Sequence, residues 1–167
     1  VKGLLGLHAD SSMDDTLLRI RELQEAKLQG QKPILIAAKS FDYLDALKPL
    51  DALARQTQAM SYRIFDSRYW LVSREQFLKD ISPQWHPTRA YLEEIFDCDD
   101  FGLEFRVFCV GRFGYNGVAI VIDDDARHLY NLVLFDDGTI EVLEPQTGRF
   151  VALTQGLYQF QQGLILI

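Results

Sequence analysis

The last third of the chain contains four short runs of β-favouring residues, separated by segments typical of turns. The runs span residues 117–122, 129–135, 139–143 and 150–153. Asp136-Asp137-Gly138 lies between the second and third runs, and an Asp-Gly pair between two apolar runs is a strong hairpin signal. Neighbouring strands joined by tight turns pair antiparallel. The sequence therefore predicts an antiparallel C-terminal sheet.

The first part of the chain instead favours helices. Residues 10–28 and 42–59 carry apolar side chains near helical spacing, and Pro49 is expected to divide the second helix. Apolar runs at 3–7 and 33–38 are consistent with strands. A helix-rich first part followed by an antiparallel sheet predicts an α+β fold. We expect an N-terminal α/β region of uncertain role at residues 1–60 and the main domain at residues 61–167.

The segment between these two parts is less regular. Residues 62–72 are rich in aromatic and β-favouring types, and Ser73 is placed to start a short helix. Residues 82–87 are predicted to form a loop because they contain two prolines. Thr88 is placed to cap a further helix that runs toward Cys98.

Composition excludes several classes of protein. Lys and Arg total 17 against 24 Asp and Glu, which gives a net charge of −7. Proteins that bind duplex nucleic acid carry a basic surface, so we expect no nucleic-acid partner. No apolar run approaches the roughly 20 residues that span a bilayer, so we expect no membrane partner. Two cysteines, Cys98 and Cys109, indicate a reducing interior or a catalytic thiol rather than a disulfide framework.

An acidic triplet, Asp123-Asp124-Asp125, separates the first two β-favouring runs. It lacks the alternating ligand positions and the distal glutamate of an EF-hand loop. We therefore expect a solvated turn here rather than a calcium loop.

Three residues in chain order indicate thiol chemistry: Cys98, His128 and Glu144. Asp97 is a plausible cap for a helix that starts at Cys98, although residues 101–108 also alternate as a strand would. The helix would place the thiol at the positive end of a helix dipole, which favours the thiolate. His128 and Glu144 lie at comparable distances from the turn at residues 136–138, so they could be neighbours on adjacent strands. A carboxylate in that position would orient the imidazole.

Three segments carry a resemblance to a known family: Cys98-Asp99-Asp100-Phe101, His128-Leu129-Tyr130-Asn131 and Glu144-Pro145-Gln146-Thr147-Gly148. Over residues 60–153 the chain resembles the papain-like domain of the Marasmius oreades agglutinin type, which also occurs in phage and bacterial proteins. The resemblance implies a papain-like fold with Cys98 as nucleophile, His128 as base and Glu144 as the third member of a triad. The sugar-binding trefoil of the fungal lectins has no counterpart here, so lectin activity is not implied.

The same resemblance implies a dependence on calcium or manganese. Asp99 and Asp100 are the positions that it suggests as metal ligands, and paired carboxylates suit hard cations. The alternative is that both are acidic residues of a first helical turn. No glutamine lies just before Cys98 as an oxyanion donor, and Gln84 is the nearest upstream candidate.

Two functions remain open from the sequence. The first is a cysteine hydrolase, most simply a peptidase, acting on a peptide or protein substrate through Cys98, His128 and Glu144. The alternative is a catalytically inactive papain-like structural or binding module of phage origin, in which Cys98 is a buried structural thiol. The compact segment between Cys98 and His128 and the missing upstream glutamine favour this alternative. Cys109 is expected to belong to the core.

Overall fold

A computed structural model describes residues 36, 38–57, 59–87, 89–153 and 156–167 of the chain. All of the described residues belong to one compact unit, residues 34–167. The strand predicted at 3–7, the helix predicted at 10–28 and most of the strand predicted at 33–38 lie outside the described residues. Among the described residues, no helix combines the length and the apolar character needed to cross a bilayer.

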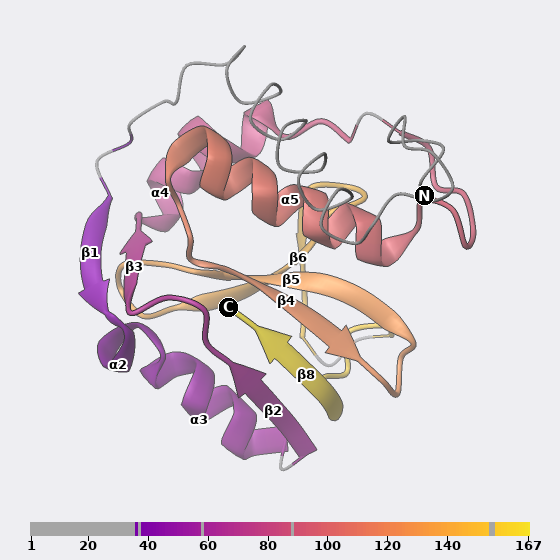
Figure 1. Cartoon of the computed structure of the whole chain (residues 1–167), viewed down its shortest axis with the longest axis horizontal. Coiled ribbons are helices and arrows are strands. Elements are labelled where there is room, and N and C mark those ends of the chain that lie inside the picture. The colour runs from indigo at the N-terminus through magenta and orange to yellow at the C-terminus, as the bar shows by residue number, and fades with distance from the viewer. Residues whose placement is uncertain (1–35, 37, 58, 88, 154–155) are drawn as a thin grey trace, which may run out of the picture. The chain divides into compact units, whose positions relative to one another are not determined.

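This unit is built on a six-stranded sheet (Figure 1). Its order is β2-β8-β4-β5-β6-β7. The strands are β2 (Ala59–Arg63), β8 (Gln162–Leu166), β4 (Val118–Asp123), β5 (His128–Leu134), β6 (Ile140–Glu144) and β7 (Arg149–Val151). β4 to β7 form an antiparallel meander whose strands fall within two residues of the four predicted runs, so this prediction is confirmed. The parallel pair of β2 with β8 was not predicted.

A second, two-stranded sheet pairs β1 (Lys39–Asp42) antiparallel with β3 (Arg68–Leu71). Two helices follow β1: α2 (Tyr43–Ala46) and α3 (Lys48–Thr57). The predicted helix over 42–59 is therefore divided as expected, but it breaks at Leu47, and Pro49 lies in the first turn of α3. A proline is tolerated there because the first-turn N–H groups have no partner within the helix. The domain boundary predicted after residue 60 falls within β2, and the division of the chain at that point stays a prediction.

The segment from Ser73 to Gln84 is helical in three pieces. Ser73 caps α4 (Arg74–Gln76) by accepting a hydrogen bond from the Gln76 N–H at 3.1 Å, as predicted. A π-helix (Phe77–Ile81) and a 3-10 helix (Ser82–Gln84) continue from it. The helix predicted to run toward Cys98 is wrong. The chain there makes a tight turn closed by Leu92 and Phe96, with Glu94 at a φ of 59°, a left-handed conformation that no α-helix contains.

The long helix α5 (Cys98–Phe113) runs across β4 and β5 in Figure 1. The alternative that residues 101–108 form a strand is therefore wrong. Asp97 begins the helix with a capping box, in which the Asp97 N–H donates to Asp100 Oδ2 at 3.4 Å. The close approach to β5 depends on Gly102, where a Cβ atom would lie 2.1 Å from a Leu129 methyl group. The buried Asn131 fixes the two layers by donating to the Gly102 and Ala119 carbonyls, both at 3.1 Å.

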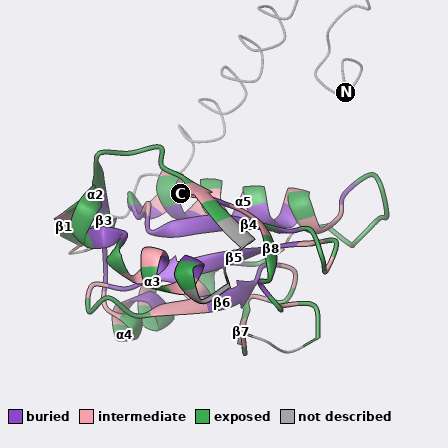
Figure 2. Ribbon diagram, turned by 90° about the horizontal axis from the view of Figure 1, so that it is seen from below, coloured by how far each residue is buried: buried purple, intermediate pink, exposed green. Residues whose placement is uncertain are grey.

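The core lies on the inner side of α5 and along the central strands, where Figure 2 shows the buried residues concentrated. Phe101, Phe105, Cys109 and Phe113 recur every four residues on the buried side of α5, which confirms Cys109 as a core residue. The molecule is thus a mixed α/β protein that is mostly sheet, which is compatible with the predicted α+β class.

Candidate functional site

His128 and Glu144 form a hydrogen-bonded pair between neighbouring strands. His128 begins β5 and Glu144 ends β6, and His128 Nε2 lies 2.8 Å from Glu144 Oε2. Both side chains are nearly buried, with 9% and 8% of their surface exposed. The predicted proximity of the two side chains is confirmed, since the hairpin turn sets the register between β5 and β6.

Glu144 accepts three hydrogen bonds through its two carboxylate oxygens. Besides the contact with His128, Oε2 accepts from the Tyr158 hydroxyl at 2.8 Å, and Oε1 accepts from the Gln146 N–H at 3.0 Å. Burial would raise the pKa of Glu144, but these donors outweigh it, so the pKa lies below its ordinary value. The site therefore holds Glu144 as a carboxylate at neutral pH.

Tyr158 is the member of this network that the sequence did not reveal. Its ring contacts the rings of His128 and Tyr130, with centroids 5.6 and 5.3 Å apart. Burial raises the pKa of Tyr158, and the hydrogen bond to Glu144 raises it further. Tyr158 precedes β8 and lies outside every motif, so no local pattern could have identified it.

The Tyr130 hydroxyl donates to Asp123 Oδ2 at 3.0 Å, and the same oxygen accepts from the Phe160 N–H at 2.9 Å. Asp123 is only 1% exposed, so the predicted solvated turn is wrong at this residue. Asp124 and Asp125 are exposed as expected. Asp123 thus anchors the segment that carries Tyr158 to the end of β4.

Cys98 is the first residue of α5 and is partly buried. Burial raises the pKa of its thiol, and the carboxylates of Asp97 and Asp99 raise it further. A hydrogen bond from the backbone of Leu129 opposes these effects without cancelling them. That contact also places the thiol beside the start of β5, next in sequence to His128.

The electrostatics of the site therefore do not favour the predicted activation of Cys98 by the helix dipole. Two carboxylates flank the thiol, and negative charge disfavours a thiolate. The roles of Cys98, His128 and Glu144 in catalysis stay predictions.

Acidic side chains gather at the N-terminus of α5. One ligand atom each from Asp97, Cys98 and Asp99 lies within 4.8 Å of the others. A hydrogen bond shared by the two carboxylates lowers the pKa of Asp97 and raises that of Asp99. Of the predicted metal pair, Asp99 belongs to this group, whereas Asp100 accepts the capping hydrogen bond from Asp97.

This donor set fits calcium poorly, because calcium takes six to eight oxygen ligands in proteins and a thiol is not one of its preferred donors. The two carboxylates of Asp97 and Asp99 supply only part of such a shell. Calcium or manganese binding through Asp99 and Asp100 stays a prediction.

Other residues considered from the sequence have structural partners. The Gln84 amide donates to the Asp80 carbonyl at 2.7 Å, so it is engaged within its own helical segment. The Trp85 indole donates to the Pro145 carbonyl at 2.8 Å and is 8% exposed. Trp85 therefore belongs to the core and supports the segment that follows Glu144.

No protein-family model matches the chain, and no curated protein sequence is similar to it. Solved structures are similar in fold. The structure named as the PSL1a–E-64 complex is 22% identical, with a TM-score of 0.55 over 77% of this chain and 50% of that chain. A structure of the Polyporus squamosus lectin bound to the epitope Neu5Aca2-6Galb1-4GlcNAc is 22% identical, with a TM-score of 0.50 over 71% of this chain and 48% of that chain.

These comparisons correct the class expected from the sequence. The chain shares a fold with these two structures and spans about half the length of each. The predicted class, a thiol protease related to phage proteins, is wrong, because a structure similar in fold is named as a lectin with a bound sugar epitope.

Proposed function

We propose that this chain is a binding module on a papain-like fold, in which Cys98 is an unreactive thiol. The observation that supports this most directly is the position of the Cys98 thiol, which is partly buried and lies within 4.8 Å of carboxylate oxygens of Asp97 and Asp99, so that the pKa of the thiol is raised. An ordinary cysteine with a pKa of about 8.5 is about 3% thiolate at pH 7, and Cys98 falls below that fraction. A nucleophile of this kind is poorly suited to attack a carbonyl.

The papain-like part of this proposal rests on the arrangement of the site. A thiol at the start of a helix adjoins the first residues of β5, and an imidazole–carboxylate pair bridges β5 and β6. In the proposed module this nearly buried pair supports the partly exposed groups beside it, Asp97, Cys98 and Tyr158. The network of Glu144, His128 and Tyr158 holds its hydrogen-bonding groups in fixed positions, which lowers the entropy lost when a ligand binds.

A carbohydrate is the ligand class that we propose for this site. The support is the structure of the Polyporus squamosus lectin, whose name includes a bound sialylated epitope. The Asp97 carboxylate and the Tyr158 hydroxyl, both partly exposed, are suitable partners for sugar hydroxyls. Isothermal titration calorimetry with Neu5Aca2-6Galb1-4GlcNAc tests this ligand class.

The unreactive thiol is tested by alkylation. Cys109→Ala leaves Cys98 as the only cysteine, and its rate of labelling by iodoacetamide is measured from pH 6 to pH 10. We expect slow labelling at pH 7 that rises steadily to above pH 9, and no adduct with E-64. Rapid labelling that reaches a plateau below pH 7.5, or a covalent E-64 adduct on Cys98, would overturn the proposal.

A further inference from the structure

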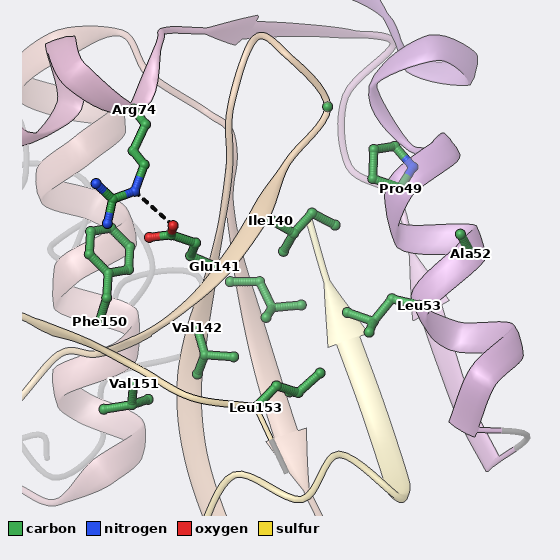
Figure 3. A pocket seen from close by; sticks show the side chains of 12 residues that line it. Pro49, Ala52, Leu53, Arg74, Ile140, Glu141, Val142, Phe150, Val151 and Leu153 are labelled. Carbon is green, nitrogen blue, oxygen red and sulfur yellow. Dashed lines mark hydrogen bonds and ion pairs between the residues drawn. The ribbon is translucent and has the colours of Figure 1, made fainter. Parts of the chain in front are cut away.

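A cavity of about 690 Å³ lies between α3 and the strands β5 to β7 (Figure 3). Its volume falls within the range of small-molecule sites, about 300–1,000 Å³. Leu53 of α3 faces Ile140 and Val142 of β6 across it, and Val151 and Leu153 continue the wall. None of Cys98, His128 and Glu144 lines this cavity, so it is separate from the site described above.

One end of this cavity is polar. Arg74 Nε donates to Glu141 Oε1 at 2.7 Å, and the guanidinium lies 5.4 Å from the centre of the Phe150 ring (Figure 3). The Arg74 side chain is 48% exposed. These two contacts orient the guanidinium plane at the margin of an otherwise aliphatic wall.

The remaining hydrogen-bond donors of Arg74 indicate the chemical class of ligand that the cavity would bind. Among the described residues, no hydrogen-bond partner is found for the two terminal nitrogens, Nη1 and Nη2. These nitrogens present two parallel N–H groups, which match the two oxygens of a carboxylate. Because the ion pair with Glu141 and the Phe150 ring already restrain Arg74, little further side-chain entropy is lost on binding.

We propose that this cavity binds a small aliphatic carboxylate. The hydrocarbon part lies against Leu53, Val142 and Val151, and the carboxylate accepts hydrogen bonds from Arg74 Nη1 and Nη2. Glu141 has two opposed effects. It orients Arg74, and it repels the incoming negative charge. This site is independent of the proposed function at Cys98.

The test uses three probes with the same hydrocarbon chain: hexanoate, hexan-1-ol and hexylammonium. Each is titrated into the ¹⁵N-labelled full chain, and the amide shifts of Ile140, Phe150 and Val151 are followed. We expect hexanoate to shift these amides at lower concentration than hexan-1-ol, and hexylammonium to bind most weakly. Equal binding of the three probes, shifts confined to other regions, or no binding at all would each overturn the proposal.

Two substitutions with opposite expected effects sharpen the test. Arg74→Gln should weaken hexanoate binding at least about tenfold, since hydrogen bonds to a charged group are lost. Glu141→Gln should tighten it several-fold, because a competing carboxylate is removed while a hydrogen-bond acceptor for Arg74 stays. The matched control is Arg55→Gln, which disrupts an Arg–Asp ion pair on α3 that does not line the cavity. A loss of hexanoate affinity in Arg55→Gln equal to that in Arg74→Gln would contradict the assignment of Arg74.

Discussion

Replacing Tyr158 with phenylalanine removes one hydrogen bond to Glu144 and leaves the aromatic packing in place. The hydroxyl donates to Glu144 Oε2 at 2.8 Å, and the Glu144 side chain is only 8% exposed. A hydrogen bond to a charged acceptor contributes about 1.5–3 kcal/mol, and solvent replaces little of it at a buried site. The ring contacts with His128 and Tyr130 are unaffected. We therefore expect Tyr158→Phe to lower the free energy of unfolding by about 2 kcal/mol at pH 7.

The pH dependence of this loss follows from the lowered pKa of Glu144. A carboxyl group whose pKa is lower in the folded state stabilises the protein above its unfolded pKa, about 4.3. That contribution disappears as the pH falls through the folded pKa. Without the Tyr158 hydroxyl, the pKa of Glu144 in the folded protein rises toward its ordinary value. The difference between wild type and variant should therefore be largest above pH 5 and shrink as the pH falls below 4.

Urea unfolding followed by tryptophan fluorescence at pH 3.5, 5 and 7 measures this difference. The matched control is Tyr69→Phe, because the buried Tyr69 hydroxyl donates to a neutral acceptor, the Ile167 carbonyl, at 3.2 Å. We expect a loss of about 1 kcal/mol in the control, with no dependence on pH over this range. A loss for Tyr158→Phe that is below 0.5 kcal/mol, or that is the same at pH 3.5 and pH 7, would refute the role of Glu144 as a charged acceptor.

Substitutions at three further positions test individual contacts of the fold. Asn131→Ala should cost about 2–3 kcal/mol in urea unfolding, because two buried carbonyls lose their donor; a loss below 1 kcal/mol would contradict this. Gly163→Ala should cost about 3 kcal/mol or more. Gly163 has a φ of 150°, and a Cβ atom there would lie 1.9 Å from the Ile122 carbonyl oxygen, so an unchanged melting temperature would exclude the pairing of β4 with β8. Ser73→Ala should cost about 1 kcal/mol through loss of the α4 cap, whereas Ser73→Asp should retain most of the stability.

Local patterns in the sequence were sufficient for much of this site. The Asp-Gly turn fixes a hairpin, so counting outward from it placed His128 near Glu144. The start of α5 was predictable for the same reason. The side chains of Asp97 and Asp100 each accept a hydrogen bond from the backbone N–H of the other residue, so the cap is complete within four residues. Features decided within one turn of helix or one hairpin can be inferred from residue types and spacing alone.

Features that depend on distant segments could not be inferred in this way. Tyr158 reaches Glu144 because the segment before β8 is anchored at Asp123, a contact between residues far apart in the chain. The parallel pairing of β2 with β8 joins segments about one hundred residues apart and leaves no local signal. The sign of the pKa shift at Cys98 depends on burial and on side-chain positions, which helix-dipole reasoning from sequence does not include.

The electrostatic cause of the raised Cys98 pKa leads to a prediction that separates charge from burial. Burial makes the largest contribution, and Asp97 adds to it. A hydrogen bond with Asp99 lowers the pKa of Asp97, so Asp97 is charged at neutral pH. This charge lies within 4.8 Å of the thiol and disfavours the thiolate. Asp97→Asn, which retains an acceptor for the Glu94 N–H, should therefore speed the alkylation of Cys98 at pH 7 by about two- to fourfold, since the thiolate fraction rises while the nucleophilicity of the thiolate falls. Asp125→Asn, an exposed change in the β4–β5 turn, should leave the rate unchanged, and 0.5 M salt should reduce the effect of Asp97→Asn. If Asp97→Asn left the rate unchanged, burial alone would keep Cys98 unreactive, and the acidic residues beside it would need another explanation.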